Sequence, residues 1–145
     1  AILEEEGTFD KFMGDAVLAF WNSPDSQEDH ALRAARAALS IIRRAQAAHP
    51  LIADTSQHMT FRIGISTGPA IIGNVGTNEL FNYTAIGDTV NLAQRLQVAA
   101  EPGEIMLQKT TYDIVAAKVD AEPLEPISVR GREQLVHVYR FTGLK

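Results

Sequence analysis

Two apolar segments near the amino terminus flank a short turn and restrict the possible folds more than any other part of the chain. Residues 9–13 and 16–21 are rich in aromatic and aliphatic side chains, which is typical of strand interiors. Gly14 and Asp15 lie between them, and glycine supplies the backbone freedom that a tight turn requires. The sequence therefore predicts a β-hairpin over residues 7–24 with a carboxylate at its tip.

The hairpin also carries charges that its apolar composition does not explain. Lys11 lies within the first segment and Asp15 lies at the turn. A charge in apolar surroundings is costly unless it is paired. Taken alone, the hairpin favours an internal salt bridge or a solvated tip over a binding role for these two side chains.

Length and composition exclude several classes of protein. A chain of 145 residues suffices for one domain, 1–145, with its own core. The net charge of −5 lacks the cationic surplus that nucleic-acid binding needs, so we expect no nucleic-acid partner. The absence of cysteine excludes disulfides and thiolate metal sites. No transmembrane run or signal peptide is apparent, so we expect a cytoplasmic location, although a longer parent protein can be tethered to a membrane through other regions.

Helical and strand periodicities alternate along the rest of the chain. Residues 1–6 resemble the end of a helix that Gly7 stops. A second helix is predicted from an N-cap at Asp25 or Ser26 to Ala48, and its arginines are interpreted as a solvated face. We expect further strands over residues 59–66, 70–72, 80–86, 104–107, 127–129 and 135–141, and further helices beginning at Asp88 as N-cap and over 110–117. This order predicts an α/β (α+β) fold with helices packed on one mixed, largely antiparallel sheet.

One of these helices carries a polar pair that suits an anionic ligand. Asn91 and Arg95 are four residues apart, so both side chains project from the same helix face. A planar amide beside a guanidinium fits an oxygen-rich anion. The alternative, an ordinary surface pair, stays open from the spacing alone.

Three extended motifs carry a resemblance to a known family. FDKFMGDAVLAFWNSP, RIGISTGPAIIGNVG and YTAIGDTVNLAQRL resemble the catalytic domain of class III adenylyl and guanylyl cyclases, in the same order and over nearly the whole chain. The resemblance implies a ferredoxin-like, palm-like core. It also implies formation of a 3′,5′-cyclic nucleotide and pyrophosphate from ATP or GTP, with two Mg²⁺ or Mn²⁺ ions per active site. The active sites of such cyclases lie between the two copies of a head-to-tail homodimer.

The resemblance assigns a role to each candidate site residue. Asp15 matches a metal-binding aspartate, and Lys11 and Thr84 match the pair that reads the base. Asn91 matches the amide that orients the ribose, and Arg95 the guanidinium that stabilises charge on the phosphate. Lys11 and Asp15, although close in sequence, would then serve opposite sites of the homodimer.

The base-reading pair favours ATP as substrate. The Lys11 ammonium donates to an adenine ring nitrogen, and the Thr84 hydroxyl can accept from the adenine amino group. Threonine at this position is characteristic of the branch that includes the bicarbonate-responsive cyclases and their bacterial relatives. A guanylyl cyclase and a non-catalytic nucleotide-binding or regulatory cyclase homology domain remain the alternatives.

Two features depart from the family pattern. Arg130 falls where the family often has a lysine that holds the terminal phosphates, and a solvated arginine at a strand end is an equal alternative. The first metal aspartate of the family lies on an earlier strand that this sequence does not contain. We therefore expect the chain as given to be inactive or barely active, with regulatory domains elsewhere in the parent protein.

Overall fold

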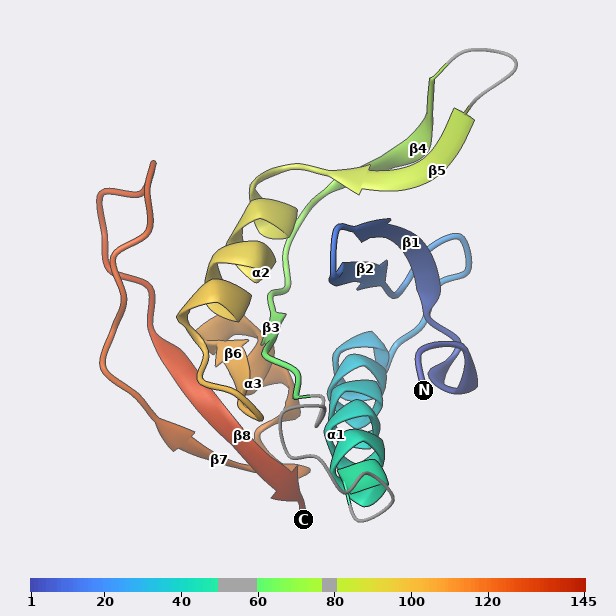
Figure 1. Ribbon diagram of the computed structural model, residues 1–145. Helices are drawn as coiled ribbons and strands as arrows, with labels where there is room; N and C mark the ends of the chain where they lie inside the picture. The colour runs from blue at the N-terminus through green and yellow to red at the C-terminus, as the bar shows by residue number, and fades with distance from the viewer. Residues whose placement is uncertain (50–59, 77–80) are drawn as a thin grey trace.

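The computed structural model describes residues 1–49, 60–76 and 81–145 (Figure 1). The elements in chain order are η1 (Leu3–Glu5), β1 (Thr8–Met13), β2 (Ala16–Phe20), α1 (His30–Ala48), β3 (Ile63–Ile65), β4 (Ile71–Gly76), β5 (Phe81–Ile86), α2 (Asp88–Ala99), β6 (Ile105–Gln108), α3 (Lys109–Val115), β7 (Val119–Pro123) and β8 (Val138–Leu144). No helix in these ranges is long and apolar enough to cross a bilayer.

A four-stranded sheet in the order β3-β6-β8-β7 forms the centre of the molecule. β3 runs parallel to β6, whereas β8 is antiparallel to both of its neighbours. Alternate residues of β6 face opposite sides of the sheet. Ile105 and Leu107 pack in one cluster with α1, and Met106 packs in another with α2. This mixed sheet with packed helices confirms the predicted fold class.

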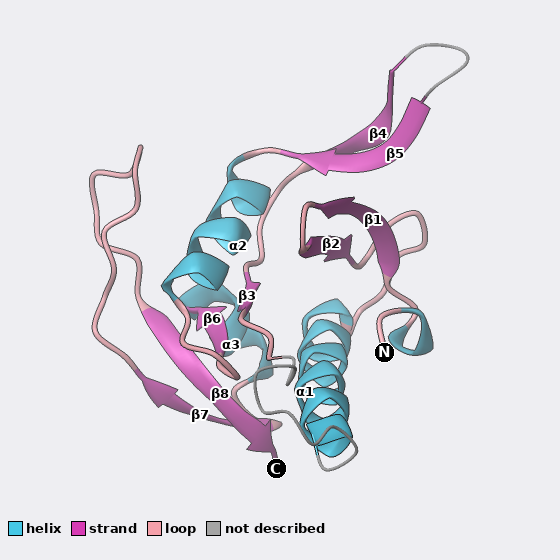
Figure 2. Cartoon of the chain, viewed as in Figure 1, coloured by secondary structure: helices cyan, strands magenta, loops and turns pink. Residues whose placement is uncertain are grey.

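Two hairpins, each a separate two-stranded sheet, accompany the central sheet. β1 and β2 pair antiparallel, and Gly14 in their turn has a φ of 64°, which confirms the predicted hairpin and its turn. β4 and β5 also pair antiparallel and project away from the rest of the chain (Figure 1). Figure 2 shows the first hairpin lying between the second hairpin and the start of α1.

The start of α1 differs from the prediction. The helix begins at His30 after an N-cap at Asp29, not after Asp25 or Ser26. Asn22 and Gln27 close the intervening loop, because the backbone N–H of each donates to the other's side-chain oxygen, at 2.8 and 2.5 Å. The end of the helix at Ala48 was predicted correctly.

The amino-terminal segment also departs from its predicted form. It is one short 3₁₀ turn, and the left-handed residue that ends it is Glu6, with φ 59°, not Gly7. Glycine at position 7 has another cause, since a Cβ there would lie 2.6 Å from ring atoms of Trp21.

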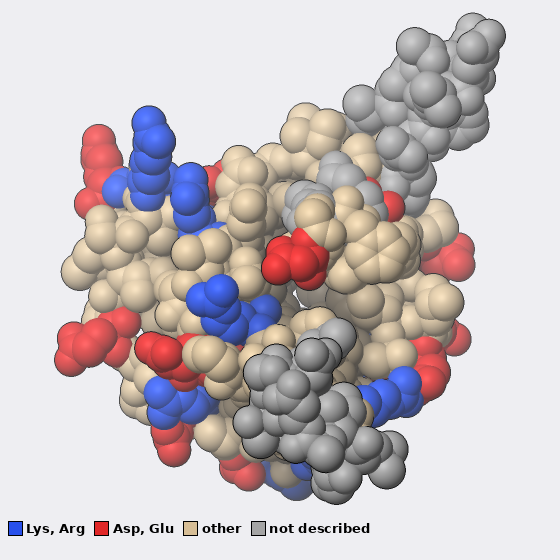
Figure 3. Space-filling view, viewed as in Figure 1, with Lys and Arg blue, Asp and Glu red and all other residues tan. Residues whose placement is uncertain are grey.

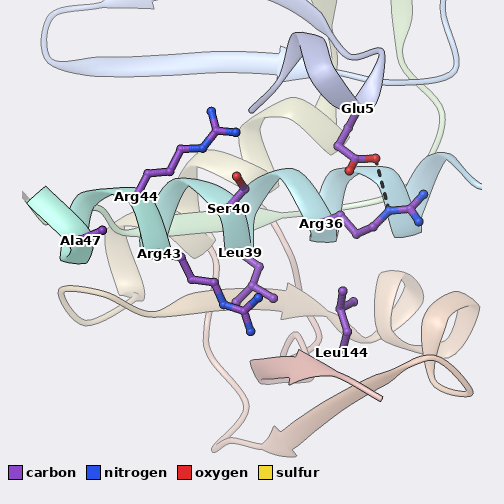
Figure 4. A pocket seen from close by; sticks show the side chains of 8 residues that line it. All are labelled: Glu5, Arg36, Leu39, Ser40, Arg43, Arg44, Ala47 and Leu144. Carbon is purple, nitrogen blue, oxygen red and sulfur yellow. Dashed lines mark ion pairs between the residues drawn. The ribbon is translucent and has the colours of Figure 1, made fainter.

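The arginines of α1 are exposed or partly exposed, in agreement with the predicted solvated face. Three of them also pair with acidic residues of the amino-terminal segment, in the pairs Arg33–Glu6 at 2.8 Å, Arg36–Glu5 at 3.2 Å and Arg44–Glu4 at 2.6 Å. Figure 4 shows the Arg36–Glu5 pair beside a depression that Leu39 and Leu144 also line. Exposed pairs of this kind add little stability each, so they mainly fix the position of the segment.

Several other predicted boundaries shift. Asp88 is the first residue of α2, and Gly87 takes the N-cap position. β7 was not predicted, residues 127–129 form only the single bridge Ile127–Val136, and β8 begins at Val138. The predicted strands 59–66 and 80–86 begin at residues that lie outside the described ranges, and their described strand residues are 63–65 and 81–86.

The contact between β3 and α2 yields a stability prediction. A Cβ on Gly64 would lie 2.5 Å from the backbone nitrogen of Gln97 and 2.7 Å from Leu96 Cβ, and closer still to the Ala93 carbonyl oxygen. Because helix backbone cannot yield like a flexible side chain, we expect Gly64→Ala to lower the free energy of unfolding by about 1–3 kcal/mol. An added Cβ on Gly143 meets no atom within 4 Å, so Gly143→Ala is the matched control in denaturant titrations. Equal midpoints for the two variants would contradict this packing.

Candidate active site

The turn between β1 and β2 presents a single carboxylate. Asp15 is exposed beside Gly14 at the tip of the hairpin, as the sequence predicted. Lys11 lies on β1 opposite Leu18, and its side chain lies outside the described part of the structure. The expectation that Lys11 pairs with Asp15 or reads a base therefore stays a prediction.

A β-bulge brings a further carboxylate into the site. The register of β1 against β2 shifts between Phe9 and Lys11, so Asp10 is the extra residue. A bulge re-aims the side chain that it carries. Asp10 Oδ2 accepts hydrogen bonds from Thr84 Oγ1 at 2.6 Å and from the Ala85 backbone N–H at 3.2 Å. Asp10 thereby joins the first hairpin to the second.

Thr84, the partner of Asp10, is buried. It lies on β5 opposite Gly73 of β4, and only 5 % of its surface is exposed. Sequence reasoning missed Asp10 as its partner. A signal was present in the second charged residue next to Lys11 in an otherwise apolar segment, but nothing local indicates which strand that carboxylate faces.

Helix α2 presents the predicted polar pair on its outer face. Leu92 and Leu96 are buried against the sheet, and Asn91 and Arg95 are both exposed. The 3.6-residue repeat explains this division, because positions 91 and 95 share a face that the leucines do not. The amide and the guanidinium are thus available to a ligand or to a second chain.

An arginine that the sequence analysis did not select contacts the first residue of α2. Arg132 forms an ion pair with Asp88, and its backbone N–H donates to the Val129 carbonyl at 3.0 Å. Arg130, the residue that was selected, is exposed two positions earlier, beside Gly131 with φ 88°. The loop therefore brings a different guanidinium to the end of α2 that carries Asn91.

Comparison with known families identifies the family of the fold. The family described as the adenylate and guanylate cyclase catalytic domain matches residues 9–142, which include every candidate site residue. The chain belongs to this family.

Individual relatives agree with the assignment. The cyclase domain is 33 % identical to adenylate cyclase 1 of Rhizobium meliloti (strain 1021) over 146 residues, which is 99 % of this chain and 22 % of that protein. It matches the crystal structure of the adenylyl cyclase CyaB from P. aeruginosa with 32 % identity and a TM-score of 0.88, over 97 % of this chain and 74 % of that one. The guanylate cyclase domain of RhGC from Catenaria anguillulae, solved with GTP, matches with 28 % identity and a TM-score of 0.86, over 99 % and 76 % of the chains.

Asp15 on the first hairpin and the Asn91–Arg95 pair on α2 lie on separate elements of the described chain. No hydrogen bond or ion pair among residues 1–49, 60–76 and 81–145 joins Asp15 to Asn91 or Arg95. Within the same ranges, no three histidine or acidic side chains cluster so as to hold a metal ion. Acidic and basic side chains are interspersed over the face shown in Figure 3.

Asp15 nevertheless fits one part of a divalent-metal site. Mg²⁺ is usually held in proteins by one or two carboxylates together with substrate phosphates and water. Asp15 offers one such carboxylate at the hairpin turn, with its side chain exposed. The remaining ligands would have to come from the nucleotide or from residues outside the described part of the chain.

Proposed function

We propose that this cyclase domain is the catalytic domain of an adenylyl cyclase that converts ATP to 3′,5′-cyclic AMP and pyrophosphate. The observation that carries the proposal is the outward projection of Asn91 and Arg95 from α2, with Asp15 exposed on a separate element. Two half-sites on one chain become complete sites when two copies pair head to tail.

Exposed apolar side chains on the two hairpins support a second copy as partner. Phe12 is 71 % exposed on β1, Ile71 is 76 % exposed on β4, and Ile86 is 50 % exposed on β5. Large side chains exposed on neighbouring elements commonly mark protein interfaces. We infer that the partner copy covers them and brings its Asp15 toward the Asn91–Arg95 face.

The reaction then follows from the roles of the chain's own residues. Lys11 and Thr84 hold the adenine, and Asn91 orients the ribose so that its 3′-oxygen lies in line with the α-phosphate. The bond from the 3′-oxygen to the α-phosphorus forms as the bond from that phosphorus to the β-phosphate oxygen breaks. The hydroxyl proton passes to solvent water, and pyrophosphate departs with the electron pair of the broken bond. Arg95 stabilises the charge that gathers on the phosphate oxygens.

Divalent metal fits this proposal through Asp15. Two Mg²⁺ or Mn²⁺ ions, when bound, would supply the positive charge that favours loss of the hydroxyl proton and neutralises the triphosphate. Asp15 would supply a carboxylate ligand to these ions.

Arg130 or Arg132 would hold the terminal phosphates. Arg130 has the expected place in the sequence, but the contact of Arg132 with Asp88 places Arg132 next to the start of α2. The chain spans 22 % of the length of the Rhizobium relative, so we place regulatory domains elsewhere in the full-length protein.

GTP is the second candidate substrate, because the RhGC domain solved with GTP also matches nearly the whole chain. Lys11 and Thr84 together favour ATP. We expect the full-length protein to form cyclic AMP from ATP with Mg²⁺ or Mn²⁺ and to use GTP at least tenfold less efficiently, about the effect of one mismatched hydrogen bond.

Initial rates with each nucleotide, followed by chromatographic separation of the products, would measure this preference. Equal or greater turnover of GTP would contradict the choice of adenine. Nucleotide binding without turnover of either would support the non-catalytic alternative.

A further inference from the structure

We propose that Asp10 determines the base preference of this site by holding the Thr84 hydroxyl as a hydrogen-bond acceptor. The inference rests on the proposed function, since it concerns how that site tells adenine from guanine. Asp10 acts through Thr84 and is therefore a positioning residue.

The β-bulge explains why Asp10 can take this role. The register shift between Phe9 and Lys11 leaves Asp10 as the unmatched residue of β1, and its side chain reaches β5. Its Oδ2 atom accepts from two consecutive residues of β5, through the Thr84 hydroxyl at 2.6 Å and the Ala85 N–H at 3.2 Å. The backbone bond fixes the carboxylate, and the fixed carboxylate then orients the hydroxyl.

The bond to Asp10 limits which further groups the Thr84 hydroxyl can bind. A threonine hydroxyl has one proton to donate and two lone pairs that accept. An ionised carboxylate can only accept, so the bond to Asp10 uses the Thr84 proton. Any further group that contacts this oxygen must donate to it.

This polarity matches adenine and opposes guanine. The 6-amino group of adenine donates hydrogen bonds, whereas the 6-oxygen of guanine accepts them. A guanine oxygen facing the Thr84 oxygen would leave two acceptors opposed, and unmade bonds of buried polar groups are costly. A threonine with a freely rotating hydroxyl could serve either base, so threonine alone does not explain a preference.

Burial strengthens the effect. Thr84 is 5 % exposed, so water has little access to compete with Asp10 for the hydroxyl proton. The second carboxylate oxygen, Asp10 Oδ1, is buried and has no hydrogen-bond partner within the described ranges. The Thr84 hydroxyl and the Asp10 carboxylate therefore offer only hydrogen-bond acceptors to a ligand. A ligand group that donates hydrogen bonds fits this arrangement.

The test compares the ratio of kcat/KM for ATP to that for GTP in variants of the full-length protein. Asp10→Ala frees the Thr84 proton, and we expect this ratio to fall about tenfold, as for the loss of one buried polar contact. Asp10→Asn keeps a carbonyl acceptor that the Ala85 N–H can orient, and the ratio should stay within about threefold of wild type, less than the effect of one lost polar contact. Asp25→Ala, at an exposed carboxylate between β2 and α1, is the matched control.

A double-mutant cycle separates this mechanism from general support of the two hairpins. In a Thr84→Val background, Asp10→Ala should not change the ratio further, because its effect passes through the missing hydroxyl. If Asp10→Ala proves unstable by thermal melting, Asp10→Ser serves in its place. We expect it to lower the ratio of kcat/KM for ATP to that for GTP, because the serine hydroxyl can donate as well as accept.

The outcomes distinguish the inference from the proposed function. If Asp10→Ala lowered kcat/KM equally for ATP and GTP, so that their ratio did not change, the role of Asp10 would be overturned. The same would follow if Asp10→Ala still lowered the ratio in the Thr84→Val background. A wild-type protein that turns over neither nucleotide would instead contradict the proposed function.

Discussion

Arg95→Ala is expected to lower the kcat of the full-length cyclase by about 10²–10³-fold, the usual effect of removing one group that stabilises transition-state charge. The side chain is exposed on α2, and the helix packs through Leu92 and Leu96. Its removal should therefore leave folding unchanged. The KM for ATP should change much less than kcat, because the guanidinium acts mainly on charge that develops during the reaction.

Two variants control this experiment. Gln94→Ala removes an exposed side chain at the preceding position of the same helix and should leave kcat within about twofold, as most surface substitutions have small effects. Arg95→Lys keeps the positive charge but loses the planar guanidinium group. Its kcat should lie between that of Arg95→Ala and that of wild type. A kcat for Arg95→Ala close to that of Gln94→Ala would remove Arg95 from the mechanism.

The parts of the site that depend on local pattern were predictable from sequence. The Gly14–Asp15 turn follows from apolar segments on both sides of a glycine, and the structure has the turn where it was predicted. The shared face of Asn91 and Arg95 follows from helical spacing, and both are exposed as the spacing requires. These features need only neighbours in the sequence.

The parts that depend on distant partners were not predictable. Asp10 and Thr84 are 74 residues apart, and their bond depends on a bulge that no sequence pattern marks. β7 contains Asp120, Glu122 and Pro123, which disfavour strands, and it forms because β8 offers an edge to pair with. Contacts between segments distant in the sequence therefore determine both the Asp10–Thr84 hydrogen bond and strand β7, and the local sequence indicates neither clearly.

Asp15→Ala should abolish turnover for a reason that links this residue to a second copy. If Asp15 serves a site whose Asn91 and Arg95 belong to the partner, Asp15→Ala and Arg95→Ala damage opposite halves of each site. A mixed dimer would then contain one site with both defects and one site with none. Neither variant alone would contain an intact site.

Mixing purified Asp15→Ala and Arg95→Ala proteins in equal amounts, after conditions that exchange subunits, tests the shared site most directly. Random pairing makes half of the dimers mixed, with one intact site in each, so cyclic AMP formation should recover to about a quarter of the wild-type rate for a two-fold symmetric dimer. Size-exclusion chromatography of differently tagged copies would verify that mixed dimers form. Mixed dimers with no more activity than either variant alone would contradict an active site built from two copies.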